Sequence, residues 1–101
     1  MKYAIYKIKP NKLNLWKDWC KELNTTHRRD ALKTLETENL LFEGFIIFEI
    51  KGDTYTIGYS AEKEGGEQPS DSTNELNKKH REIKKECLEP LSRGESEYFL
   101  I

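Results

Sequence analysis

The sequence predicts an α+β sandwich, and three observations support this fold class. Strand-like and helix-like segments follow one another in the order β-α-β-β-α-β. A tight turn of sequence KGD, with Gly52-Asp53 expected at its tip, joins the two middle strands as an antiparallel hairpin. Right-handed crossovers then place the outer strands in the same sheet, as in the ferredoxin-like sandwich with two helices on one face.

The first strand and the first helix are expected on either side of Pro10. Tyr3–Ile8 alternates and is rich in β-formers, so it predicts a strand. Lys12–Glu38 predicts a long helix, and its interruption by Asn24-Thr25-Thr26 predicts a kink. The apolar stripe of this helix consists of Trp16, Cys20, Leu23, His27 and Ala31.

The middle strands are expected at Leu41–Ile50 and Thr54–Ser60, and a polar loop is expected at Ala61–Asp71. On the first of these strands, both faces carry apolar residues. We expect the face with Phe42, Gly44, Ile46, Phe48 and Ile50 to cover the helices. The opposite face carries Leu41, Glu43, Phe45, Ile47 and Glu49.

A second apolar sheet face predicts a homodimer that packs sheet to sheet. Burial of apolar surface stabilises by about 25 cal/mol per Å², and exposed apolar patches usually mark interfaces. The alternative is a sheet face that stays partly exposed in a monomer.

The second helix is expected from a capping box, with Ser72 at the N-cap and Glu75 reaching back. It should run to about Leu88, and Pro90 marks its end. Glu97–Ile101 (EYFLI) then predicts the last strand.

Length and composition limit the class of protein. A chain of 101 residues predicts one domain, 1–101. A net charge of −1 argues against nucleic acid or anionic lipid as a partner. The two cysteines have no CxxC spacing and indicate reduced thiols. Without a signal-like or membrane-spanning run, the expected location is the cytoplasm, with no membrane partner.

The candidate catalytic residues are His80 and Glu43. His80 lies on a helical stripe with apolar residues, while the neighbouring lysines and arginines fall mostly off it. It is either a hydrogen-bonded core histidine or an acid or base in a pocket, because its ordinary pKa is near neutrality. Glu43, on the expected interface face, is either half of an ion pair or a pocket acid. The residues that share the His80 stripe are Leu76, Ile83 and Cys87.

Four other residues are candidates for binding a ligand. Tyr55 and Tyr59 could provide a hydroxyl and an aromatic wall beside the carboxylate. His27 lies on the stripe of the first helix, and Arg28 begins an arginine pair that could clamp a carboxylate or phosphate. The alternative is a core histidine and an exposed arginine pair. No metal-ligand spacing, phosphate loop or nucleophile motif occurs, so no cofactor or metal is predicted.

Three runs carry a resemblance to a known group: KIKPNKLNLWKDWCKEL, ALKTLETENLLFEGFIIFEI and KKHREIKKECLEP. Together they cover most of the chain, which resembles an uncharacterised family of small bacterial proteins in the dimeric α/β-barrel group. The resemblance implies a ferredoxin-like protomer and a dimeric barrel, and it implies no reaction. The wider group includes sugar mutarotases, monooxygenases and ligand binders, and the signatures of these are missing here.

Two classes of function remain. The first is a small-molecule-binding or structural domain without catalysis, which we favour because the candidate polar residues are few. The second is a cofactor-free enzyme, isomerase- or mutarotase-like or monooxygenase-like, with His80 as acid or base and Glu43 as its partner. An open cavity at His80, with Glu43 or a tyrosine within hydrogen-bond reach, would favour the enzyme.

Overall fold

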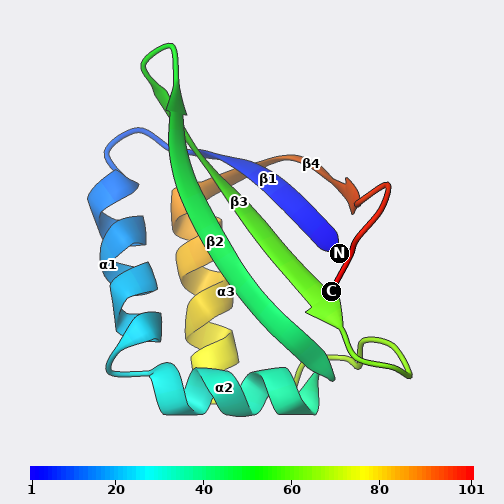
Figure 1. Cartoon of the computed structure of the whole chain (residues 1–101). Coiled ribbons are helices and arrows are strands. Elements are labelled where there is room, and N and C mark those ends of the chain that lie inside the picture. The colour runs from blue at the N-terminus through cyan, green and yellow to red at the C-terminus, as the bar shows by residue number, and fades with distance from the viewer.

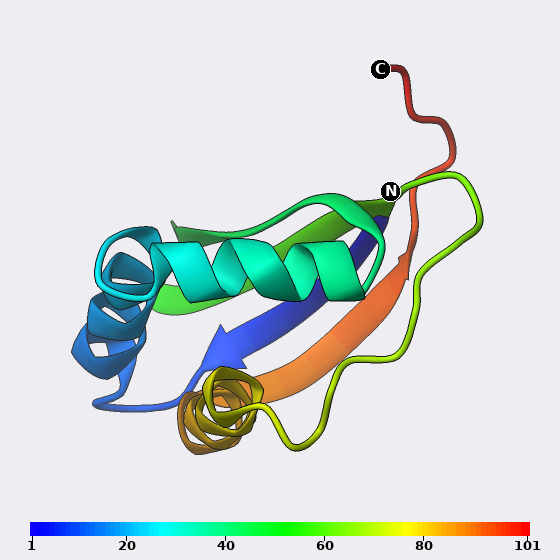
Figure 2. The ribbon, with the colours of Figure 1, turned by 90° about the horizontal axis from the view of Figure 1, so that it is seen from below.

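The computed structural model describes residues 1–101 and confirms the α+β fold class. Four strands form one antiparallel sheet in the order β2-β3-β1-β4, which is the ferredoxin-like arrangement. Figure 1 shows α3 behind the sheet, α1 beside it at the left and α2 across the lower ends of both helices, and Figure 2 shows the same elements from below. The elements are β1 (Lys2–Ile8), α1 (Leu13–Asn24), α2 (Arg28–Thr37), β2 (Leu40–Ile50), β3 (Asp53–Glu62), α3 (Glu75–Cys87) and β4 (Leu88–Glu95).

The predicted first helix is two helices, because the expected kink is a complete break. At the break, the Thr25 hydroxyl donates to the Lys21 carbonyl at 2.7 Å, and the His27 N–H donates to the Glu22 carbonyl at 2.8 Å. Threonine and asparagine side chains compete with the backbone for such bonds and weaken a helix interior. As a result α2 leaves the direction of α1. No helix of the chain has the length and apolar character needed to cross a membrane.

The core lies where α1 and α3 meet the sheet. Trp16 and Trp19 are fully buried there with Cys87 at the end of α3. The Trp16 indole N–H donates to the Thr56 hydroxyl at 3.3 Å, and Thr56 is 0% exposed. The hydroxyl in turn donates to the Ile46 carbonyl at 3.0 Å, so this buried polar pair has its partners.

The two sheet faces are assigned the other way round from the prediction. Phe45 and Ile47 pack against the core, and the Phe45 ring meets Trp16 edge-on at 5.0 Å. Ile46 and Ile50, which were expected to cover the helices, are 53% and 52% exposed on the open face. Alternation along a strand shows which residues share a face. When both faces are apolar, it does not show which face covers the helices, and packing determines this. Glu43 has the parity of Phe45, so it lies on the helix-covered face.

The β2–β3 hairpin is confirmed, with its turn one residue earlier than expected. Ile50 pairs with Asp53, and the two residues between them are Lys51 and Gly52. Both have positive φ, 50° and 84°. That conformation is typical of a two-residue turn of type I′, and glycine adopts it without strain.

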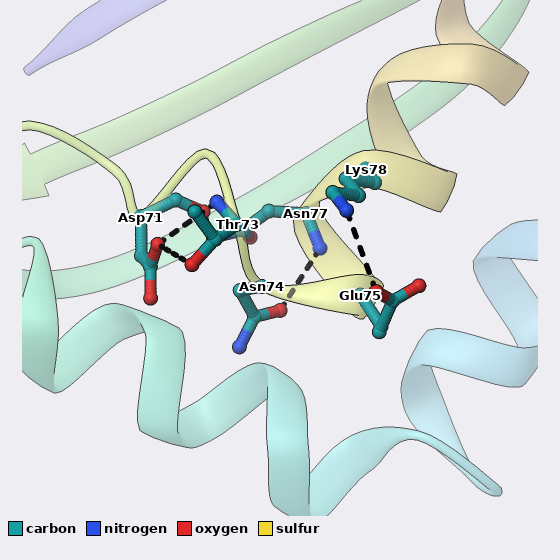
Figure 3. A network of polar contacts seen from close by, with 6 residues as sticks. All are labelled: Asp71, Thr73, Asn74, Glu75, Asn77 and Lys78. Carbon is teal, nitrogen blue, oxygen red and sulfur yellow. Dashed lines mark hydrogen bonds and ion pairs between the residues drawn. The ribbon is translucent and has the colours of Figure 1, made fainter.

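The predicted capping box at Ser72 is wrong, because α3 begins two residues later. Asn74 is the N-cap, and its side-chain oxygen accepts from the Asn77 N–H at 3.1 Å (Figure 3). The Asp71 carboxylate accepts from the N–H and the hydroxyl of Thr73 at 2.9 and 2.7 Å. These bonds fold the preceding residues into a turn, so Ser72 stays outside the helix.

The predicted last strand at Glu97–Ile101 is also wrong. The helix α3 passes directly into β4 at Leu88, and β4 pairs with β1. Pro90 lies inside this strand, opposite Tyr6 and beside a register shift. An edge strand with an irregularity tolerates a proline, which cannot donate to a ladder. The apolar tail beyond β4 therefore forms no strand, and Leu100 and Ile101 are 85% and 90% exposed.

Candidate functional site

A cavity of about 730 Å³ lies between α2, α3 and the helix-covered face of the sheet. In Figure 2, α2 and α3 lie apart on this side of the sheet. Ala4 and Gly58 are cross-strand partners on β1 and β3, and both line the cavity. A Cβ atom on Gly58 would lie 2.7 Å from the Phe45 ring. Gly58 therefore makes room for the Phe45 ring, and the small side chain of Ala4 borders the cavity beside it.

His80 lines this cavity from α3, and aromatic rings hold its imidazole in place. The ring centroid lies 6.0 Å from that of Trp19, 6.3 Å from that of Trp16 and 6.1 Å from that of Phe45. The buried Trp19 indole N–H donates to His80 Nδ1 at 2.8 Å. An Nδ1 that accepts carries no proton, so the neutral ring carries its proton on Nε2.

The Nε2–H group of His80 has no acceptor within the chain. No buried side-chain nitrogen or oxygen lacks a partner, so this atom is one that solvent reaches. Burial and, to a smaller extent, the charge of the nearby Lys84 ammonium together lower the pKa of His80 to about 4. At neutral pH the ring therefore offers a fixed N–H donor and no free lone pair.

Lys84 lies one helical turn after His80 and lines the same cavity. Its ammonium is 5.3 Å from the centroid of the Tyr6 ring and 5.8 Å from that of Phe45. Cation–π contacts of this type hold the side chain over the sheet. No carboxylate lies within 4.0 Å of the Lys84 ammonium, although the side chain is half-buried.

Two carboxylates, Glu43 on β2 and Glu38 at the end of α2, line the cavity. Burial raises the pKa of Glu43, Lys84 opposes that rise, and Glu67 adds to it. Burial also raises the pKa of Glu38, helped by the charges of Glu43 and Glu67. By surface area Glu43 is exposed, so water screens much of this effect. Neither carboxylate has an ion-pair partner within 4.0 Å.

The predicted site residues divide into two groups. His80, Glu43 and Tyr59 all line the cavity, although Tyr59 lies across Gly44 on the other side of the sheet. Tyr55 is outside the cavity, where it stacks on Phe48 at 5.5 Å.

His27 and Arg28 also lie outside the cavity. His27 is the residue before α2, so the helix break removes it from the stripe on which it was predicted. Its ring lies 5.7 Å from that of Trp19. Arg28 lines a separate groove on the outer surface of α2.

The sequence prediction missed six charged residues that line the cavity: Lys2, Glu38, Arg81, Lys84, Arg93 and Glu95. Lys84 could have been found, because it follows His80 by four positions on a helix and shares its face. Arg93 depends on the register of β4 against β1, where it pairs with Ala4. No signal in the sequence sets that register.

The side chains of the chain include no group of three His, Cys, Asp or Glu placed to hold a metal ion. In comparisons with known proteins, the model of a family of unknown function, DUF6176, matches residues 2–101. Comparisons with curated proteins and with solved structures gave no match.

Proposed function

Since the chain belongs to DUF6176, a family of unknown function, we propose its role from the geometry of its own cavity. The protein binds a small polar molecule between α2, α3 and the sheet. The observation that carries this proposal is the orientation of His80, whose Nδ1 is held by Trp19 at 2.8 Å. That bond aims a neutral N–H donor at a cavity large enough for a small ligand.

Binding is favoured over cofactor-free catalysis with His80 as acid or base. A general acid or base works best when its pKa is near the working pH, and the pKa of His80 is lowered to about 4. The Nδ1 lone pair is also occupied by the Trp19 indole. An isomerase- or mutarotase-like role for His80 would require it to give up that bond.

A second part of the proposal is a homodimer formed through the open sheet face. Ile46 and Ile50 are more than half exposed there, beside the stacked rings of Phe48 and Tyr55. The apolar tail contacts the same face through Phe99, 5.9 Å from Phe42. Residues on this face thus expose apolar area that a second copy would cover.

Charge on the open face agrees with pairing between identical copies. Lys7 alternates with the core residues of β1, so it lies on this face, and it is 3.7 Å from Asp53 of the same protomer. At this pair, two such faces can approach without bringing unpaired like charges together, because Lys7 and Asp53 offset each other. The cavity lies on the opposite side of the sheet, so the proposed binding site is not the interior of a barrel.

The binding proposal is tested by titrating ¹⁵N-labelled protein with small neutral, anionic and cationic polar compounds. We expect amide shifts at Phe45, Gly58 and Lys84, and none at Arg28 on the outer surface of α2. Ser60→Phe places a ring in the cavity and should abolish the shifts, while Ser72→Phe, in the exposed turn before α3, should leave them unchanged. Absence of shifts for every compound would contradict the proposal.

A matched pair of variants distinguishes the roles of the two ring nitrogens of His80 in stability and in binding. His80→Asn places an oxygen near the Nδ1 position, so it keeps an acceptor for Trp19 and removes the N–H in the cavity. It should weaken binding about tenfold and change stability little. His80→Leu leaves the Trp19 N–H unpaired and should lower the free energy of unfolding by about 1 to 3 kcal/mol.

A further inference from the structure

We infer that the cavity binds a small hydroxylated carboxylate. Its carboxylate is held by the His80 N–H and the Lys84 ammonium, and its hydroxyl groups donate to Glu43 and Glu38. This inference rests on the proposed function, because it names the class of molecule for the same cavity.

The anion-binding side is formed by donors without partners in the chain. Lys84 is half-buried and has no carboxylate within 4.0 Å. By contrast, Lys2 at the edge of the same cavity is 2.8 Å from Glu67. A half-buried ammonium group without an ion-pair partner in the chain is available for an anion from solution. Together with the neutral His80 N–H it forms two donors that a carboxylate can accept from.

Two arginines at the rim add to this preference. Arg81 on α3 and Arg93 on β4 line the cavity, are exposed, and lie more than 4.0 Å from every carboxylate. Their charges attract an approaching anion and raise its local concentration.

The carboxylates on the opposite side of the cavity determine which groups the ligand needs besides its own carboxylate. In their ionised form, the carboxylates of Glu43 and Glu38 only accept hydrogen bonds, so a ligand bound beside them presents donors. They also disfavour a dianion such as a phosphate ester, since each added charge is repelled. A single carboxylate is therefore favoured as the anionic group.

Hydroxyl groups fit these acceptors better than an ammonium does. Lys84 lies near enough to Glu43 to oppose the rise in the pKa of that carboxylate. A ligand ammonium placed at Glu43 would therefore be close to a like charge. Hydroxyl groups donate without this repulsion, and the volume of about 730 Å³ is sufficient for a six-carbon chain.

The test compares four compounds with six-carbon chains by calorimetry at low ionic strength. D-Gluconate has a carboxylate and hydroxyls, sorbitol has hydroxyls only, D-glucamine has an ammonium and hydroxyls, and hexanoate has a carboxylate only. We expect gluconate to bind at least about tenfold more tightly than each of the others. The affinity should fall as salt is added, because part of it is electrostatic.

Variants test which residues on each side of the cavity bind the ligand. Lys84→Met should weaken gluconate binding about tenfold, and Lys85→Met, at the next and exposed position of α3, should leave it unchanged. Glu43→Gln should reduce the preference for gluconate over hexanoate, since the gluconate hydroxyls lose a charged acceptor.

Each contrary result identifies the statement that fails. If sorbitol or glucamine binds as tightly as gluconate, the inferred preference for a carboxylate is wrong. If hexanoate binds as tightly as gluconate, the inferred preference for hydroxyl groups is wrong. If none of the four binds while another polar compound still shifts the cavity amides, the inferred class fails and the binding proposal stands. If no polar compound shifts them, both fail.

Discussion

His80 shows how one residue can belong to the core and to a site at once. Leu76 and Ile83 pack against the core and Cys87 is buried, so the helical stripe predicted for His80 is confirmed. A core histidine and a pocket histidine were the two alternatives for this residue, and each describes one of its ring nitrogens. Nδ1 is a core acceptor for Trp19, and Nε2 carries the N–H that solvent reaches.

A pH dependence of stability follows from the lowered pKa of His80. The unfolded chain binds a proton at this residue below about pH 6.5, whereas the folded protein does so only near pH 4. The free energy of unfolding should therefore fall as the pH drops from 6.5 toward 4, by at most about 3 kcal/mol. The actual change should be smaller because the ring is only partly buried.

Urea unfolding between pH 7.5 and 4.5 measures this effect, and His80→Asn should give a flatter profile than the wild type. Long-range ¹⁵N–¹H spectra should show the His80 proton on Nε2 at neutral pH. A ring that titrates near 6.5, or that carries its proton on Nδ1, would contradict the bond to Trp19.

At the scale of elements, short-range side-chain bonds decide where helices begin and end. Thr25 ends α1 by bonding back to the Lys21 carbonyl at 2.7 Å, and Asn74 begins α3 by accepting from Asn77 at 3.1 Å. Both positions carry residue types that mark helix boundaries. The sequence predicted a kink at the first and placed the second two residues too early, since Ser72 also fits a cap.

The cap of α3 gives a prediction about stability. Asn74→Ala removes the acceptor for the Asn77 N–H and should lower the free energy of unfolding by about 1 kcal/mol. Ser72→Ala should change it by less than about 0.5 kcal/mol, because that side chain caps nothing. Thermal unfolding of the two variants measures both values, and a larger loss at Ser72 would contradict the observed cap.

At the scale of the whole molecule, the sheet separates two surfaces for which we propose different roles. The helix-covered face holds the core and the polar cavity, while the open face exposes Ile46 and Ile50. This arrangement allows a dimer and a binding site to exist in one small protein without sharing residues of the same face.

The dimer is tested by sedimentation equilibrium across a concentration series. The wild type should sediment with twice the protomer mass of 11.9 kDa. Ile46→Glu should give monomers with little change in protomer stability, because Ile46 is 53% exposed within the protomer. Leu32→Glu, at a 47% exposed position on α2, is the control and should remain dimeric. A monomeric wild type at micromolar concentration would contradict the dimer.

By itself, the sequence determined the types and order of most elements, the hairpin and the inward stripe of α3. These features depend on periodicity and on the turn preferences of neighbouring residues, which a short window of sequence contains. Only the tertiary structure decided that Phe45 rather than Phe42 meets Trp16, and that β4 follows α3 without a loop. Because both faces of β2 carry apolar residues, the local pattern allows either face to cover the helices. Packing between segments that are distant in the sequence selects one of them. The cavity depends on the same selection, because Glu43 lines it together with His80 and Lys84 only when Phe45 faces the helices.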